Sequence, residues 1–155
     1  MRTKSIIIQL SLLVCFTASA SAIIGTSALS INHHGIYSVT SLADITNNLE
    51  FDFCKADVRS SSDKQLDNLA SFLIAKKLAV SLRGHADGRG SYVGNWKMSD
   101  KRALAVKDYL MKKGVADDKI VTTPFGSTIP VASNRTAAGR QKNRRVEIRI
   151  DNPNL

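Results

Sequence analysis

Cysteine and histidine are scarce in this sequence, and their scarcity excludes two kinds of site. The 155 residues include two cysteines and three histidines. Cys15 lies in the apolar N-terminal segment, so a chain that has lost this segment keeps only Cys54 and has no intramolecular disulfide. His33 and His34 are adjacent in a polar stretch, without other ligands at metal-binding spacing. We therefore predict neither a disulfide framework nor a metal site.

Acidic residues are also few. The chain has 13 Asp and Glu residues against 22 Lys and Arg residues, which gives a net charge of +9, and none of the acidic residues precedes Asp44. Loss of Arg2 and Lys4 with an N-terminal signal lowers the net charge by two, from +9 to +7. Such a basic domain is attracted to polyanions by long-range, salt-sensitive forces, and its partner can be nucleic acid, anionic lipid or an acidic wall polymer.

The first 22 residues have the three parts of a secretory signal peptide. Arg2 and Lys4 form a basic start, residues 6–16 are largely apolar, and residues 18–22 are all Ala or Ser. This order predicts a signal peptide over residues 1–22 that is cleaved after Ala20 or Ala22.

Two other interpretations keep the N-terminus attached to a membrane. One is an uncleaved anchor, although the apolar stretch is shorter than the roughly 20 residues that span a bilayer. The other is lipid attachment at Cys15, because the preceding residues loosely resemble a bacterial lipobox, although Val14 stands where a small residue is usual. All three interpretations export the chain, which makes nucleic acid the least expected partner.

A polar stretch without hydrophobic periodicity follows the signal. Residues 23–44 mix Ser, Thr, Asn and Gly with isolated apolar residues, so we predict a tether or poorly packed lead-in there. The composition, 43% hydrophobic and 23% charged, is that of an ordinary globular protein, and the length suits one domain. We place this domain at residues 45–151.

Two hydrophobic periods alternate within the domain. A period of two predicts strands near residues 49–53, 80–83 and 146–150, with another strand expected at 119–123. Spacing of three and four predicts helices over residues 62–77 and from beyond residue 95 to Gly114, which can end a helix in the left-handed conformation. This order predicts an α/β (α+β) two-layer sandwich with a mixed sheet, at least partly parallel, and helices packed on one face.

The most informative charged residues are Asp87 and Arg102. Asp87 lies in a glycine-rich loop after the second strand, and Arg102 interrupts the apolar stripe of the second helix, four residues from both Met98 and Val106. One interpretation is that these two side chains pair with each other and fix the loop. The other is that they serve one zwitterionic ligand, with the carboxylate accepting from an ammonium and the guanidinium holding a carboxylate.

The residues around this pair resemble a known family, the OmpA-like peptidoglycan-binding domain. Its signature is GHTD, then a glycine, an asparagine and LSxxRA, and its second half ends in a segment similar to NRRVE. The matching residues are Gly84, His85, Ala86, Asp87, Gly90, Asn95, Met98, Ser99, Arg102, Ala103 and Val106, then Phe125, Gly126, Pro130, Ser133, Asn134, Thr136, Gly139, Arg140, Asn143, Arg144, Arg145, Val146 and Glu147. With the strand around Phe51, the resemblance covers roughly residues 45–151 in order and spacing.

The resemblance implies a ligand and a role for the charged pair. Members of this family bind the diaminopimelate residue of the peptidoglycan stem peptide. By that resemblance, Asp87 takes the side-chain ammonium of diaminopimelate and Arg102 takes its neighbouring carboxylate.

Four further residues enter the expected site by the same matching. Asn95 and the backbone near Met98 are expected to contribute hydrogen bonds. Arg144, the first arginine of the NRRV segment, is expected to line the site beside Asp52.

The sequence departs from the family pattern at several positions. Ala86 replaces the threonine of GHTD, which removes a hydroxyl that can contribute about 1 kcal/mol, so a weaker affinity is expected. Gly94 replaces a tyrosine and Met98 a leucine. Cys54 replaces a commonly polar residue and is expected to pack as a small apolar side chain, with a reactive or intermolecular thiol as the alternative.

Other residues give no sign of catalysis. His85 is expected to form a structural hydrogen bond at the strand end, and Ser91 and Ser99 have no histidine and acid at a spacing that suits a triad. The basic residues of 135–149 are interpreted as a solvated face, because no aromatic residues are interleaved with them for base stacking. We therefore predict no enzyme activity, no cofactor and no nucleic-acid partner.

The sequence thus predicts a periplasmic protein, associated with the outer membrane and cell wall, that binds peptidoglycan and anchors an envelope component to it. The alternatives are a wall-contact subunit of a motor or secretion assembly, with envelope protein partners, and a peptidoglycan hydrolase or its activator.

Overall fold

The computed structural model describes residues 42–151, and in this part of the chain helices and strands alternate. The elements are α1 (Leu42–Thr46), β1 (Leu49–Glu50), α2 (Asp63–Lys76), β2 (Ala79–Gly84), α3 (Tyr92–Lys112), β3 (Ile120–Pro124), α4 (Ala137–Asn143) and β4 (Arg145–Asp151), with short 3-10 turns at Ser60–Ser62 and Asp117–Lys119.

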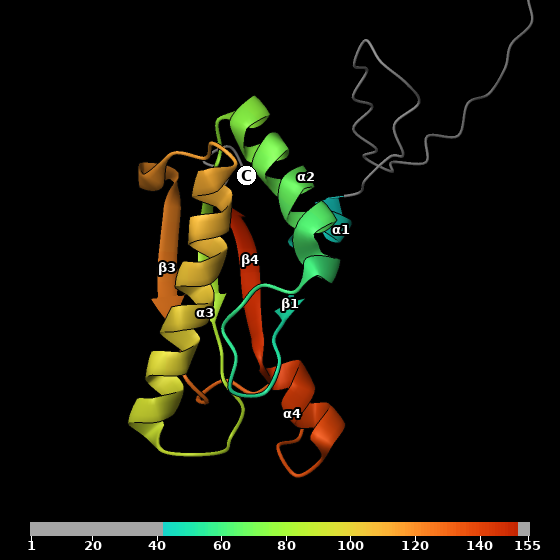
Figure 1. The fold of residues 1–155 in the computed structure, drawn as a ribbon, viewed down its shortest axis with the longest axis vertical. Helices are drawn as coiled ribbons and strands as arrows, with labels where there is room; N and C mark the ends of the chain where they lie inside the picture. The colour runs from blue at the N-terminus through green and yellow to red at the C-terminus, as the bar shows by residue number, and fades with distance from the viewer. Residues whose placement is uncertain (1–41, 152–155) are drawn as a thin grey trace, which may run out of the picture.

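The four strands form one mixed sheet in the order β1-β4-β2-β3. Strand β2 is parallel to β3, whereas β4 is antiparallel to both β1 and β2. As a result, the carboxyl ends of β1, β2 and β3 and the start of β4 lie at the same edge of the sheet. This edge is at the lower end of Figure 1, where the loops that follow these strands gather.

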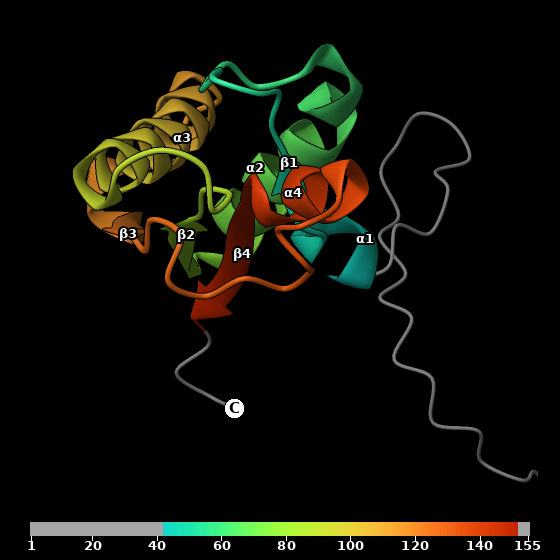
Figure 2. The same ribbon diagram turned by 90° about the horizontal axis from the view of Figure 1, so that it is seen from below.

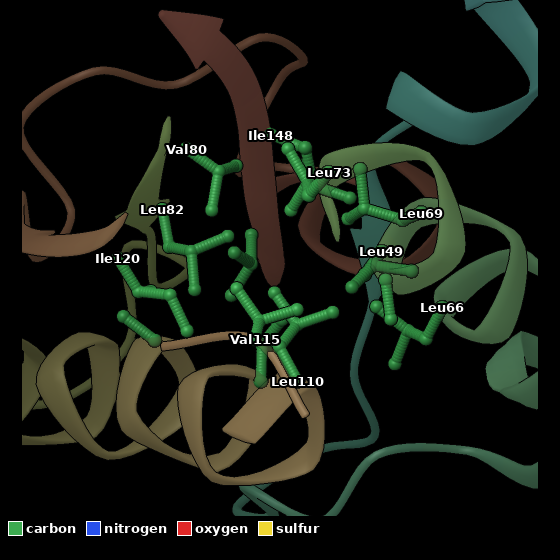
Figure 3. Close-up of a cluster of buried hydrophobic side chains, with 14 of the residues drawn as sticks. Leu49, Leu66, Leu69, Leu73, Val80, Leu82, Leu110, Val115, Ile120 and Ile148 are labelled. Carbon is green, nitrogen blue, oxygen red and sulfur yellow. The ribbon is translucent and has the colours of Figure 1, made fainter. Parts of the chain in front are cut away.

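Helices α2 and α3 pack side by side on one face of the sheet, and the apolar core lies between the two layers (Figures 1 and 2). Figure 3 shows leucine side chains of both helices facing Val80 and Leu82 of β2 and Ile148 of β4. The helical stripes supply Leu66, Leu69, Leu73, Val106 and Leu110, and the strands supply Leu49, Val80, Leu82, Val146 and Ile148. The predicted two-layer fold with helices on one face is therefore confirmed.

The close packing of α3 on β2 depends on Gly84. A Cβ atom at this position would lie 2.0 Å from the backbone oxygen of Ser99. Because no side chain fits in that space, glycine at the end of β2 allows α3 to lie directly on the strand. Strand β2 therefore ends, at Gly84, directly beneath Ser99 of α3.

The periodic elements follow the sequence closely. The structure has a helix at Asp63–Lys76 and strands at Ala79–Gly84, Ile120–Pro124 and Arg145–Asp151, within a few residues of the predicted ranges. Gly114 follows α3 with a φ of +96°, as expected for a residue that ends a helix in the left-handed region.

The first predicted strand, in contrast, is too long. Only Leu49–Glu50 pair in the sheet, and Phe53 is 55% exposed instead of buried. The chain turns after Phe51, because the backbone N–H of Lys55 donates to the oxygen of Asp52 and Cys54 has a φ of +56°. The local turn therefore overrides the alternation of apolar and polar residues.

Three helical features were not predicted. Helix α3 begins at Tyr92, where the Ser91 hydroxyl accepts a hydrogen bond from the N–H of Gly94 and caps the helix. Helix α4 is only seven residues long. Helix α1 begins within the stretch predicted as a tether, and its Ile45 is buried.

The predicted signal peptide, its membrane-anchor alternative and the lipidation of Cys15 lie outside the described residues. Over residues 42–151, no helix is both long enough and apolar enough to cross a membrane.

Candidate ligand-binding site at the carboxyl edge of the sheet

Asp87 lies at the carboxyl edge of the sheet in a loop that backbone hydrogen bonds hold in place. The loop follows β2, and the N–H of Ala86 donates to the oxygen of Gly126 over 2.7 Å. The N–H of Gly88, two residues further on, donates to the side-chain oxygen of Asn134 over 2.9 Å. Asp87 itself is only 5% exposed, and its Oδ1 accepts from the N–H of Arg89. The carboxylate is thus fixed in a nearly water-free position.

The ion-pair partner of this carboxylate is Arg144. Its Nη1 donates to Oδ2 of Asp87 over 2.7 Å, and only 11% of the Arg144 side chain is exposed. The other nitrogens are also engaged, because Nε donates to the oxygen of Phe51 and Nη2 donates to Oε1 of Gln141. The Arg144 guanidinium therefore connects α4, the segment after β1 and the loop after β2.

Arg102 occupies the same edge of the sheet but pairs with no carboxylate. Its Nη1, Nε and Nη2 donate to the backbone oxygens of His85, Lys55 and Asp52, at 2.9, 3.0 and 3.3 Å. No ion pair among residues 42–151 includes Arg102, although only 1% of the residue is exposed. Burial, together with repulsion from Arg144, lowers the pKa of Arg102 to about 10, so the side chain remains a cation at neutral pH.

The structure excludes one of the two interpretations of the charged pair. Asp87 and Arg102 do not pair with each other; Asp87 pairs with Arg144, 57 residues further along the chain. The site thus contains two buried or largely buried cations and one buried carboxylate. A positive charge in a low-dielectric setting remains without a counter-ion among the described residues, and such a charge attracts an anionic group.

The other three predicted site residues lie around this centre. Asp52 is exposed at its side chain, which accepts from Arg59, and the hydrogen bonds and charge of Arg59 lower the pKa of the Asp52 carboxyl. Asn95 is half-buried, and its Nδ2 donates to Oγ of Ser127 over 3.2 Å. Met98 is half-buried on α3, one residue before Ser99. The structure therefore brings all six residues to one edge of the sheet, but Asp52 reaches Arg102 through its carbonyl rather than its carboxylate.

Two residues of the site were missed. Gln141 bonds Arg144 and donates to the oxygen of Phe51 and to Oε2 of Glu50. The centroid of the Phe53 ring lies 5.8 Å from the guanidinium of Arg89 and 5.9 Å from that of Arg144. Gln141 gives no sequence signal, and the alternating pattern placed Phe53 in the core.

The expected hydrogen bond of His85 is wrong. Both ring nitrogens are buried without a hydrogen-bond partner, and Nε2 lies 3.4 Å from Oε1 of Glu147 without the geometry of a bond. The imidazole instead stacks on Phe125, with ring centroids 5.2 Å apart. Burial and then the charge of Arg145 lower the pKa of His85 to about 4, so the ring is neutral at physiological pH.

Two further expectations need correction. Residues 135–149 are not simply a solvated basic face, because Arg145 is buried and bonded to Glu147, and Arg144 is largely buried. Cys54 is exposed at the tip of the turn after β1 and does not pack in the core.

The comparisons with known proteins identify the family of the chain. A model of the OmpA family matches residues 50–144, which is more than half of the chain. The chain therefore belongs to the OmpA family.

Among its relatives is outer membrane protein A of Bordetella avium, which is 41% identical over 101 residues covering 64% of this chain and 52% of the relative. Peptidoglycan-binding protein ArfA of Mycobacterium tuberculosis is 49% identical over 72 residues, 46% of this chain and 22% of that protein. The crystal structure of the peptidoglycan-associated lipoprotein from Burkholderia pseudomallei is similar, with a TM-score of 0.63 and 28% identity over 67% of this chain and 89% of that one. The chain spans about a third to a half of the length of the first curated relatives that it matches.

Proposed function

We propose that this domain binds peptidoglycan non-covalently, without turnover, through the diaminopimelate residue of the stem peptide. The observation that carries the proposal is the excess positive charge buried beside Asp87, where Arg102 has no carboxylate partner among the described residues. A ligand with one ammonium and one carboxylate adds no net charge, but its carboxylate supplies the counter-ion that Arg102 lacks, while its ammonium pairs with Asp87. Diaminopimelate carries such a pair at the end of its side chain.

Asp87 is the proposed acceptor for the ligand ammonium. A carboxylate offers about four lone-pair positions, and Asp87 uses one on each oxygen, for Arg89 and Arg144. The remaining positions can accept from an ammonium without loss of the Arg144 ion pair. Since the carboxylate is already fixed and nearly dry, the added bond is charge-assisted and strong.

Arg102 is the proposed cation for the ligand carboxylate. A guanidinium has five N–H donors, and Arg102 uses three of them on backbone oxygens. The other two N–H donors and the fixed positive charge of Arg102 remain for the ligand carboxylate. Asp52 supports this role through its carbonyl, and we propose that Asn95 and the backbone near Met98 supply neutral hydrogen bonds at the margin of the site.

The names of the relatives support peptidoglycan as the polymer that the domain binds. ArfA is named as peptidoglycan-binding, and the similar crystal structure is that of a peptidoglycan-associated lipoprotein. Peptidoglycan lies outside the inner membrane, which agrees with the exported, periplasmic location expected from the sequence. We propose that the bound domain anchors an envelope component to the wall.

The proposal is tested by titration of free diaminopimelate and of isolated sacculi against Asp87→Asn. This change keeps the size of the side chain and removes its charge. Loss of one charge-assisted hydrogen bond predicts an affinity roughly 10- to 100-fold weaker. Calorimetry measures the diaminopimelate affinity, and co-sedimentation measures the fraction of protein on sacculi.

Asp117→Asn is the matched control, because Asp117 is an exposed aspartate that pairs with Lys107 away from the site. We expect this variant to bind as the wild type does. Equal binding by folded Asp87→Asn and wild type would reject the proposed ligand site. Release of soluble muropeptides from sacculi by the wild type alone would instead favour the hydrolase alternative.

A further inference from the structure

Two large aromatic side chains stand exposed at the start of α3. Tyr92 is 62% exposed and Trp96 is 42% exposed. Their ring centroids are 6.2 Å apart and their planes differ by 30°, so the two rings form one continuous apolar surface. Exposed aromatic groups of this kind in a folded domain usually mark a binding surface.

The spacing along α3 explains how this surface arises. Tyr92 and Trp96 continue, at steps of four and three, the stripe that buries Ser99, Ala103, Val106 and Leu110. The sheet ends beneath Ser99, at Gly84, whereas the helix extends past the tip of β3 (Figure 1). The two rings thus point to the same side of the helix as the core, but no strand of residues 42–151 lies beneath them.

The surface adjoins the proposed diaminopimelate site. Tyr92 follows Asp87 by five residues, and the loop between them ends at Ser91, which caps α3. Asn95, which lies between the two aromatic residues in sequence, bonds Ser127 on the far side of the same edge. The backbone of Trp96 packs closely on Gly126, whose oxygen accepts from Ala86 in the Asp87 loop.

We propose that Tyr92 and Trp96 form a glycan subsite, on which a sugar ring of the peptidoglycan strand stacks while its stem peptide occupies the Asp87 site. The inference rests on the proposed function. Pyranose rings present C–H faces that pack on aromatic faces, whose electron density favours the positive edge of a C–H bond. The polar neighbours Ser91, Asn95 and Lys97 suit the hydroxyls around the rim of a sugar.

The architecture of the polymer makes this occupant more suitable than a protein. Diaminopimelate is the third stem residue, so two residues and a lactyl link separate it from the glycan, a reach of roughly 10 Å when extended. The glycan must therefore pass close to the surface that flanks the site. A stable protein interface needs about 800 Å² on each partner, far more than two rings surrounded by polar residues provide.

The sequence contains a single tryptophan, and it belongs to this surface, so fluorescence reports on it directly. The two probes are the tripeptide L-Ala-D-Glu-diaminopimelate and the same tripeptide on its N-acetylglucosamine–N-acetylmuramic acid disaccharide. We expect the wild type to bind the disaccharide form roughly 3- to 10-fold more tightly, as one aromatic stacking contact allows. The Trp96 emission should shift with the disaccharide form and stay unchanged with the tripeptide.

The variants Tyr92→Ala and Trp96→Ala should lose the gain from the sugar, measured by calorimetry, and keep the tripeptide affinity. The preserved tripeptide affinity shows that each variant is folded. Leu104→Ala is the control, because Leu104 is an exposed apolar residue of the same helix, outside the stripe, with 40% exposure.

The outcomes separate the two proposals. A wild type that binds neither probe would reject the proposed function and this subsite with it. Tripeptide binding without any gain from the sugar, or a gain that survives in both alanine variants, would overturn the glycan subsite and leave the proposed function standing.

Discussion

Replacing Arg102 with alanine is expected to lower the free energy of unfolding by about 3 to 5 kcal/mol, because the substitution removes hydrogen bonds to three buried or partly buried backbone oxygens and leaves a cavity. These oxygens belong to Asp52, Lys55 and His85, on two separate segments of the chain. The relief of a buried charge offsets only part of this loss. Urea unfolding followed by circular dichroism at neutral pH measures the difference.

Arg59→Ala is the matched control, because Arg59 is a partly exposed arginine whose ion pairs with Asp52 and Glu50 lie at the surface. We expect this variant to lose less than about 1 kcal/mol. If Arg102→Ala lost as little free energy of unfolding as Arg59→Ala, the three backbone contacts of Arg102 would contribute little to stability. The large expected loss also means that weaker ligand binding by Arg102→Ala would not identify a ligand contact. Asp87→Asn keeps the size of the side chain but breaks the ion pair with Arg144, so its unfolding is measured alongside its binding.

A second large effect is the loss of stability in acid through His85. Its pKa is about 4 in the folded protein against an ordinary value of 6.5, because burial and the charge of Arg145 disfavour the imidazolium. Between these two values the unfolded chain binds the proton and the folded chain does not, so stability falls as the pH falls from 6.5 to 4 and then levels off. The full shift corresponds to about 3 kcal/mol.

The groups that face this imidazole are Arg83 on β2, Arg145, Glu147 and Arg149 on β4, and Phe125 after β3. Burial raises the pKa of Glu147, but the hydrogen bond from Arg145 and the nearby cations lower it overall, so its contribution is lost mainly below pH 4.5. Urea unfolding at pH 7, 5.5 and 4.5 therefore isolates the histidine.

His85→Phe is the variant of choice, because it keeps a ring to stack on Phe125 and cannot be protonated. Its free energy of unfolding should change by less than about 1 kcal/mol over this pH range, in contrast to that of the wild type. Parallel pH profiles for the two proteins would show that His85 is not the titrating group.

The periodic parts of the fold were predictable because their pattern is set by burial on one face. Helix α2 and strands β2 and β4 each have a buried stripe that matches the period of the element. The segment after β1 has the same alternation, yet it makes a local turn, and Arg102 and Arg144 hold this turn by donating to backbone oxygens of residues 51–55. The local alternation of apolar and polar residues does not indicate hydrogen-bond partners that come from distant elements.

The candidate site was likewise predictable only in part. The position of Arg102 in the helix stripe indicates a side chain on or beside the buried face, and the residue is buried in the structure. Its partners are backbone oxygens, which every residue has, so no residue type could indicate them. The pairing of Asp87 with Arg144 depends on strand order, because β4 must lie beside β2 to bring the two residues together. Spacing along the chain does not determine that order.

The errors at Cys54 and His85 have a common cause. Residue type alone suggested a packed thiol and a bonded imidazole, but backbone conformation and neighbouring charges decide both environments. Cys54 has a left-handed φ of +56° at a turn tip, which directs it to solvent. His85 lies among arginines that donate to Glu147 or repel a protonated ring.

The three bonds of Arg102 also bear on how quickly a ligand can come and go. The turn at residues 52–55 and the end of β2 are tied to α3 before any ligand arrives, so their ordering entropy is lost on folding and not on binding. Under the proposed function, association then needs no loop closure, and each release leaves the site ordered for the next stem peptide. A protein bound in this way to a polymer that is continually cut and extended can move from one attachment point to another without reordering its binding site.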